Sequence, residues 1–435
     1  MNMKKQMKYF LLPLMLLGMT ACSGTEKMSA DTKGGDGGSD PTYSYDDALA
    51  PTGGDYIEEG GYSEGIPDGD IEGSGDEDPG TSVDNQARPK PGQLTCSALD
   101  DNKYYDYWKS LATSNQEGQG QFQYYREHFA FNTFNRLDLT INNGNDVSVK
   151  VKGDTYATKV DNLHKAYLFP QVEQEEYTVE ISYLDNNDER QTIEKVVTNE
   201  EVIDLENTST IYNNLEIMFV IDATGSMSDE MAYLKSEIDD VISKVKEENA
   251  TANISLAMMV YRDEGDEYVT KYSDFTTDIA SQQTWLAKQS ANGGGDFPEA
   301  VQTALSEAMN KQWSAKSTKL LFHVADAPSH DKDVQSWNNT TLLAARKGIK
   351  IISVASSGID LKTEYFFRSQ SLLTSGQYVY LTNDSGIGGS HLDATTEEKL
   401  VVEYLNECLV RLINGYYTGE FAEPVSWRQS NQNQQ

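Results

Sequence analysis

The stretch LEIMFVID at 215–222 is an apolar run that ends in a carboxylate, and ATGSM at 223–227 follows it directly. An apolar run followed by a glycine turn and then by helical periodicity predicts a buried parallel strand that leads into a helix. In such sheets ligands gather beyond the carboxyl ends of the strands, where Asp222, Thr224 and Ser226 fall. Their oxygens, without Cys or His, suit a hard cation such as Mg²⁺, Mn²⁺ or Ca²⁺. The alternative role is structural: Asp222 ends the strand, and Ser226 caps the next helix together with Asp229.

Two later segments place further carboxylates at predicted loop positions. The stretch GGGDFPE at 293–299 puts Asp296 on a loop before an apolar helical stripe, and LLFHVAD at 320–326 is a second apolar strand that ends in Asp326. Because each lies at the head of an αβ crossover, we expect these carboxylates to meet Asp222 at one edge of a sheet. Asp296 has an alternative role as a helix N-cap, with Glu299 at the third helical position.

These motifs, in this order, resemble the von Willebrand factor type A domain with its metal-ion-dependent adhesion site. That family surrounds one divalent cation with an Asp-x-Ser-x-Ser turn, a Thr from a Gly-Gly-Thr loop and an Asp after a later strand. Here Thr224 replaces the first Ser, and Gly295 stands where the Thr is usual. The form GGGDxPE with DAPxH at 326–330 looks like a bacterial and kinase-associated branch. The resemblance implies one ion, with Mg²⁺ preferred over Mn²⁺ or Ca²⁺, held by Asp222, Thr224, Ser226, Asp296 and Asp326.

The resemblance also implies a protein-binding module used for adhesion or scaffolding. In that family an acidic residue of the protein partner completes the coordination of the ion. An extra carboxylate on the metal would neutralise more of its charge, tighten metal binding and weaken its attraction for an acidic partner. The alternative function is a metal-dependent hydrolase, in which His330 acts as a base beside a metal-bound water. The sequence has no phosphate loop, no HEXXH motif and no nucleophile elbow, so we expect binding and no enzyme activity.

Strand and helix patterns alternate through 214–415, the extent of the resemblance. They predict an α/β fold with a doubly wound, mostly parallel, Rossmann-like sheet. Strands are also expected at 254–261, 267–272, 350–355 and 378–381, and helices at 227–246, 279–289, 333–347, 361–373 and 397–415. The loop NDSGIGGSH at 383–391 should lie at the same edge as the metal, so Ile387 and His391, with His330, are candidate partner contacts.

The beginning of the chain predicts an envelope location. Residues 1–21 combine lysines with a short apolar stretch and resemble a lipoprotein signal peptide, and MTAC at 19–22 resembles the cleavage box. Cys22 is therefore the expected lipidation site, with an ordinary secretory signal as the alternative. We expect a bacterial protein that is lipid-anchored in the cell envelope, at the outer membrane or cell surface. The Gly- and acid-rich segment 22–93 predicts a disordered tether.

The remaining segments complete the predicted organisation. Short runs of period two between 94 and 213 predict a small β-sandwich domain before the α/β domain, and 416–435 is a C-terminal tail. The formal net charge of −34 disfavours nucleic acid as a partner. Cys96 and Cys408 are either a disulfide pair or free thiols, with a buried thiol favoured for Cys408.

Overall fold

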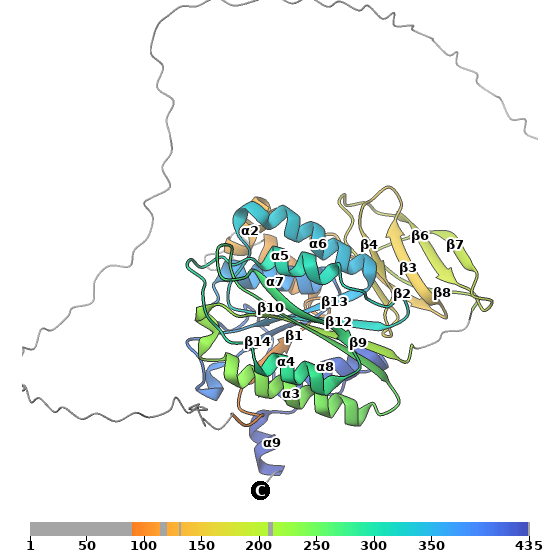
Figure 1. Cartoon of the computed structure of the whole chain (residues 1–435). Coiled ribbons are helices and arrows are strands. Elements are labelled where there is room, and N and C mark those ends of the chain that lie inside the picture. Colours follow the sequence, from red (N-terminus) through yellow and green to blue (C-terminus); the bar gives the residue numbers. More distant parts are fainter. Residues whose placement is uncertain (1–88, 114–119, 130–131, 208–211, 434–435) are drawn as a thin grey trace, which may run out of the picture. The chain divides into compact units, whose positions relative to one another are not determined.

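The computed structural model describes residues 89–433 except for 114–119, 130–131 and 208–211 (Figure 1). The predicted signal peptide, the lipidation site Cys22 and nearly all of the predicted tether lie outside the described residues.

An eight-stranded sheet forms the centre of the described fold, with the order β11-β10-β9-β12-β13-β14-β1-β15. Five adjacent strands of this sheet run parallel: β10 (Asn253–Tyr261), β9 (Asn214–Asp222), β12 (Thr318–Ala325), β13 (Ile349–Ala355) and β14 (Tyr378–Leu381). β11 (Thr270–Thr276) pairs antiparallel with β10 at one edge. At the other edge β1 (Thr95–Leu99) runs antiparallel to β14 and to β15 (Glu403–Tyr404). The predicted mostly parallel α/β sheet is therefore confirmed.

Helices cover both faces of this sheet (Figure 1). One face carries α3 (Met231–Glu248), α4 (Ile279–Ala287) and α8 (Leu405–Thr418), and the other carries α5 (Val301–Met309), α6 (Val334–Lys347) and α7 (Leu361–Leu373). The side chains of β9 alternate between the two faces of the sheet. Phe219 packs in the core on the side of α3, and Val220 packs in the core on the side of α5. Both faces of a parallel strand are buried in such an arrangement, which explains the continuous apolar runs in the sequence.

The segment expected to open the β-sandwich domain belongs to the large sheet instead. Besides β1, the helices α1 (Tyr105–Thr113) and α2 (Gly120–Phe129) also join the α/β unit. Trp108 of α1 stacks on Tyr365 of α7 with ring centroids 5.8 Å apart. The fully buried Arg368 of α7 binds Asp101, with 2.6 Å between Nη2 and Oδ1. Described residues on both sides of the predicted boundary at 213/214 therefore belong to one compact unit with a shared core.

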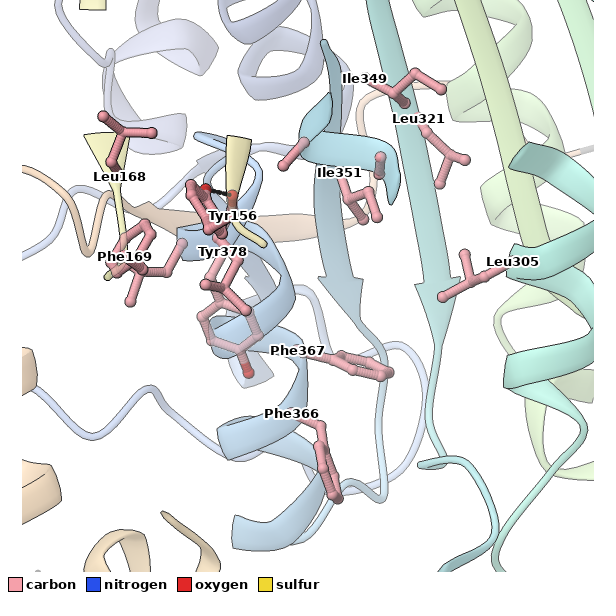
Figure 2. Close-up of a cluster of buried hydrophobic side chains, with 14 of the residues drawn as sticks. Tyr156, Leu168, Phe169, Leu305, Leu321, Ile349, Ile351, Phe366, Phe367 and Tyr378 are labelled. Atoms are coloured by element: carbon pink, nitrogen blue, oxygen red, sulfur yellow. Dashed lines mark hydrogen bonds between the residues drawn. The ribbon is translucent and has the colours of Figure 1, made fainter. Parts of the chain in front are cut away.

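The residues between α2 and β9 form two small sheets, with strand orders β5-β2-β8 and β4-β3-β6-β7. Their strands are β2 (Leu137–Asn142), β3 (Asn145–Val151), β4 (Ala157–Lys159), β5 (Lys165–Leu168), β6 (Tyr177–Leu184), β7 (Arg190–Val197) and β8 (Glu200–Asp204). Their apolar side chains share a core with one face of the large sheet, as Figure 2 shows for Leu168, Tyr156 and Ile351. The Tyr156 hydroxyl also donates to the Leu373 carbonyl, at 2.6 Å. The strands do not enclose a separate core, which an independent sandwich domain would have.

The C-terminal part differs from the prediction in its boundaries. The predicted helix 397–415 begins only at Leu405, because β15 occupies Glu403–Tyr404. Within the predicted tail 416–435, α8 continues to Thr418 and α9 (Trp427–Asn433) follows. Cys96 and Cys408 are buried free thiols. Burial, with the neighbouring Cys408, raises the pKa of Cys96 above its ordinary value. Among the described helices, none is long and apolar enough to cross a membrane.

Candidate metal centre

The turn after β9 brings three predicted ligands together. Asp222 is fully buried, and its Oδ1 accepts hydrogen bonds from Thr224 N at 2.9 Å and Thr224 Oγ1 at 2.7 Å. The hydroxyl oxygens of Thr224 and Ser226 lie 3.2 Å apart. Arg262 stabilises the turn, because its Nε donates a hydrogen bond to the Ala223 carbonyl at 3.1 Å. Asp222 Oδ2 has no hydrogen-bond partner among the described residues.

Asp326 follows β12, the strand beside β9 in the sheet. Its side chain is 5% exposed, and Oδ1 is another buried oxygen without a hydrogen-bond partner in the described chain. Burial raises the pKa of Asp222 and of Asp326 above their ordinary values, and the Asp326 charge raises that of Asp222 further. Both carboxylates thus lack a charged partner that would offset their burial.

The glycine loop contributes a carboxylate that the sequence analysis did not assign to the site. Glu299 is 3% exposed, and its Oε2 has no hydrogen-bond partner among the described residues. Its backbone N–H donates to the Pro328 carbonyl at 2.9 Å, which ties the loop to the segment after β12. Burial, followed by the charge of Asp222, raises the pKa of Glu299 to about 9.

The same loop leaves Asp296 exposed at the lining of a cleft. α5 begins at Val301 with Ala300 at the N-cap, so Asp296 does not cap this helix and Glu299 is not within it. Both the N-cap hypothesis and the predicted helical position of Glu299 are therefore wrong.

Gly294 allows the loop to close over the carboxylates. It has φ +75°, and a Cβ at this position would lie 3.0 Å from Glu299 Oε1 and 3.2 Å from Thr224 Cβ. A larger residue would strain the backbone and push against both side chains. The glycine run therefore serves the close approach of the loop to the turn.

The donor chemistry fits a hard divalent cation. Three buried carboxylate oxygens without partners, on Asp222, Asp326 and Glu299, occur together with the hydroxyls of Thr224 and Ser226. Thr224, Ser226, Glu299 and Asp326 also line one open cleft. In the described part of the chain, no three His, Cys, Asp or Glu side chains converge closely enough to hold an ion by themselves. An ion bound beyond the carboxyl ends of β9 and β12 would therefore depend on the hydroxyl oxygens, which Mg²⁺ accepts as ligands.

The loop 383–391 lies at this edge as predicted, since Gly389 and Ser390 line the cleft. His391 is buried, however, and its Nε2 lies 2.9 Å from Glu230 Oε1. Ile387 is half-buried and packs against the core below the loop. The His391 ring therefore anchors the loop inside the fold, and its contact with a partner stays a prediction.

His330 is also engaged with a carboxylate. Its Nε2 lies 2.8 Å from Asp263 Oδ1, and its side chain is 18% exposed. It does not line the cleft that contains Ser226 and Asp326. The ring is therefore partly buried and paired rather than solvated.

Comparison with known proteins places a family match over this site. Residues 216–393 match the family model described as "von Willebrand factor A domain". The matched range begins in β9 and contains all of the residues that form the cleft.

Two curated proteins share part of this sequence. "Alpha-protein kinase vwkA" of Dictyostelium discoideum is 26% identical over 167 residues, which are 38% of this chain and 27% of that protein. "Putative ariadne-like RING finger protein R811" of Acanthamoeba polyphaga mimivirus is 26% identical over 218 residues, which are 46% of this chain and 20% of that protein. The matched segments thus span less than a third of either relative.

Proposed function

Because the chain contains a von Willebrand factor A domain, we propose that it is a protein-binding module whose binding depends on a divalent cation. The ion, with Mg²⁺ preferred over Mn²⁺ or Ca²⁺, would be held by Asp222, Thr224, Ser226 and Asp326. Asp296 and Glu299 are the two carboxylates of the glycine loop that could add to them. When bound, the ion supplies a positive centre to which a partner can offer an oxygen ligand.

The observation that carries this proposal is the set of buried carboxylate oxygens without partners on Asp222 and Asp326. Buried carboxylates are normally paired or coordinate a metal, because an isolated buried charge costs several kcal/mol. Asp326 lines an open cleft together with Thr224 and Ser226, and Asp222 accepts a hydrogen bond from the Thr224 hydroxyl at 2.7 Å. A site of this kind leaves room for a group from another molecule.

Binding accounts for the arrangement better than hydrolysis. A hydrolase would need a base within hydrogen-bond reach of a metal-bound water. The candidate base His330 is directed to Asp263 Oδ1 at 2.8 Å and is not part of the cleft lining. The kinase and RING finger names belong to the relatives, whose matched segments cover only a minor part of each.

The location is proposed from the sequence. Lipidation at Cys22 would anchor the protein in a bacterial envelope, with the acidic segment 22–93 as a spacer. In this arrangement the cleft faces protein partners outside the cytoplasm, in the same envelope or on another surface. Nucleic acid is disfavoured by the net charge of −34.

Affinity capture with and without a chelator tests the proposal. Wild type and Asp222→Ala would be incubated with envelope extracts and with host-protein extracts in Mg²⁺. We expect partners that wild type retains in Mg²⁺, and that both the chelator and Asp222→Ala release. Asp274→Ala is the matched control, because Asp274 is 76% exposed on β11 and outside the cleft. A partner retained equally under all of these conditions would exclude metal-dependent binding.

A further inference from the structure

A second cavity lies at the opposite ends of the parallel strands from the candidate metal centre, beside the first residues of β12 and β13. Its volume is about 90 Å³, and its lining includes Lys319 of β12, Lys350 of β13 and Lys159 of β4. Because one water molecule needs only about 10–15 Å³ of such space, the cavity has room for several waters or one small polyatomic anion. Three lysines around one cavity contrast with the formal net charge of −34 for the whole chain.

Two of the three lysines are paired with the aspartates of the lining. Lys350 Nζ lies 2.7 Å from Asp161 Oδ2, with both side chains 8% exposed. Lys159 pairs with Asp146, which also binds Arg190. These pairs use both acidic residues that line the cavity.

Lys319 is the lysine of the lining that forms no direct ion pair, although the Glu216 and Asp146 charges act on it from a greater distance. It is 5% exposed, and burial, followed by the nearby Lys159 charge, lowers its pKa to about 8. Its Nζ donates to the Ser317 carbonyl at 3.3 Å. Glu216 is its neighbour in the sheet register, but the Glu216 carboxylate accepts from Ser314 N at 2.9 Å and from Ser317 Oγ at 2.6 Å. A buried ammonium group without a paired charge is costly, and a bound anion would offset this cost.

Neutral donors complete the lining. His164 has φ +61°, a left-handed conformation that is uncommon outside glycine, and its ring has no hydrogen bond to a described residue. The Tyr212 hydroxyl is buried and also has no hydrogen-bond partner within the described chain. Such groups can donate to an oxyanion that the Lys319 charge attracts.

We propose that this cavity binds a small oxyanion, the phosphate or carboxylate group of a small molecule, with Lys319 as its charge partner. His164 and Tyr212 orient the anion by hydrogen bonds. Lys159 and Lys350 form neutral pairs with Asp146 and Asp161, so Lys319 supplies the net positive charge of the lining. The site is separate from the candidate metal centre, since the two lie at opposite ends of the same strands.

Equilibrium dialysis of the metal-free full chain with radiolabelled inorganic phosphate tests the proposal. We expect saturable binding to wild type, displaced by sulfate and not by chloride at equal ionic strength. Lys319→Met should weaken binding about tenfold or more, because a charge-assisted contact is lost. Lys319→Arg retains the charge and should retain measurable binding. The control Lys288→Met removes an exposed lysine outside the cavity and should change nothing.

Acetate in place of sulfate identifies the preferred group. If acetate displaces the labelled phosphate at a concentration similar to that of sulfate, the site is assigned to carboxylates. If acetate displaces it more weakly than sulfate does, the site is assigned to phosphate. Equal phosphate binding by wild type, Lys319→Met and Lys288→Met would overturn the proposal, as would equal displacement by chloride and sulfate. Asp326→Ala should bind phosphate as wild type does. Phosphate binding can therefore be tested independently of the proposed metal site.

Discussion

Asp326 and the two carboxylates of the glycine loop make the metal hypothesis specific at the level of residues. Asp326→Ala should abolish the Mg²⁺ or Mn²⁺ binding heat in calorimetry and leave most of the fold intact. Glu299→Gln should weaken Mg²⁺ binding more than Asp296→Asn does, because Glu299 is 3% exposed with an unpartnered oxygen while Asp296 is exposed. The reverse order would make Asp296 the loop ligand, as the sequence first suggested.

Glu299 should also give the metal-free protein a pH dependence of known sign. Folding raises its pKa from 4.5 to about 9, so between these values the folded state binds more protons than the unfolded state. Stability from this group therefore falls as pH rises through the window. In the presence of chelator, the free energy of unfolding of wild type should fall relative to that of Glu299→Gln as the pH rises from about 5 to about 9. Urea denaturation at each pH measures this difference. A constant difference between the two proteins would contradict this assignment.

The sequence placed Asp222, Thr224, Ser226 and Asp326 correctly at strand ends, because apolar runs that end in a carboxylate mark the edge of a parallel sheet. It could not place Glu299, since PE after a glycine run resembles a helix start, whereas in the structure Glu299 pairs with Ser329 in the segment after β12. The burial of His391 depends on Glu230, which is 161 positions away in the chain. No local pattern reveals such a contact.

At the level of elements, the loop 383–391 is held by the pair of His391 and Glu230, whose side chains are each 1% exposed. His391→Ala should therefore lower the free energy of unfolding by about 3 kcal/mol, because it leaves a buried carboxylate without its partner. Chemical denaturation measures this loss, with the exposed Asp393→Asn as the control. An unchanged midpoint together with selectively weakened partner binding would restore His391 as a contact residue.

The element β1 makes a second prediction, about where the folded unit begins. A fragment that starts at residue 214 lacks β1 and α1, so it exposes the outer edge of β14 and the face of Tyr365 that stacks on Trp108. Exposed edges and aromatic faces promote aggregation. We expect this fragment to aggregate in size-exclusion chromatography, whereas the chain from residue 89 remains monodisperse. A folded, monomeric 214–433 fragment would show that 89–213 is dispensable.

Element prediction from the sequence succeeded where local periodicity was strong. The central strands and α6 and α7 were found close to their observed bounds, because full burial requires continuous apolar runs and helical stripes. β1 was missed, since TCSAL at 95–99 becomes a strand only through its pairing with β14. β7 has no clear apolar alternation in the sequence, because its side chains are mostly exposed and mostly polar.

For the whole molecule, the predicted lipid anchor at Cys22 would determine the compartment in which the cleft meets its partners. Cys22→Ser should prevent acylation and move the protein from the membrane pellet to the soluble or secreted fraction, since Cys22 is the cysteine at the signal-like boundary. Fractionation and labelling with a fatty-acid probe measure both effects, and Cys96→Ser is the control because Cys96 is buried in the fold. Unchanged membrane partition would indicate another attachment.

The pairing of β1 with β14 also sets the order in which the chain can fold. Thr95 and Thr382, whose hydroxyl groups are 2.8 Å apart, are separated by 287 positions in the sequence. Contacts of such high sequence separation carry a large loop-closure cost and form slowly, whereas the strand–helix–strand units between them are local. During synthesis, the early β1 segment has to wait for a partner that emerges almost three hundred residues later. The edge of β14 stays uncovered until the two strands pair, so this pairing closes the edge against association with other chains.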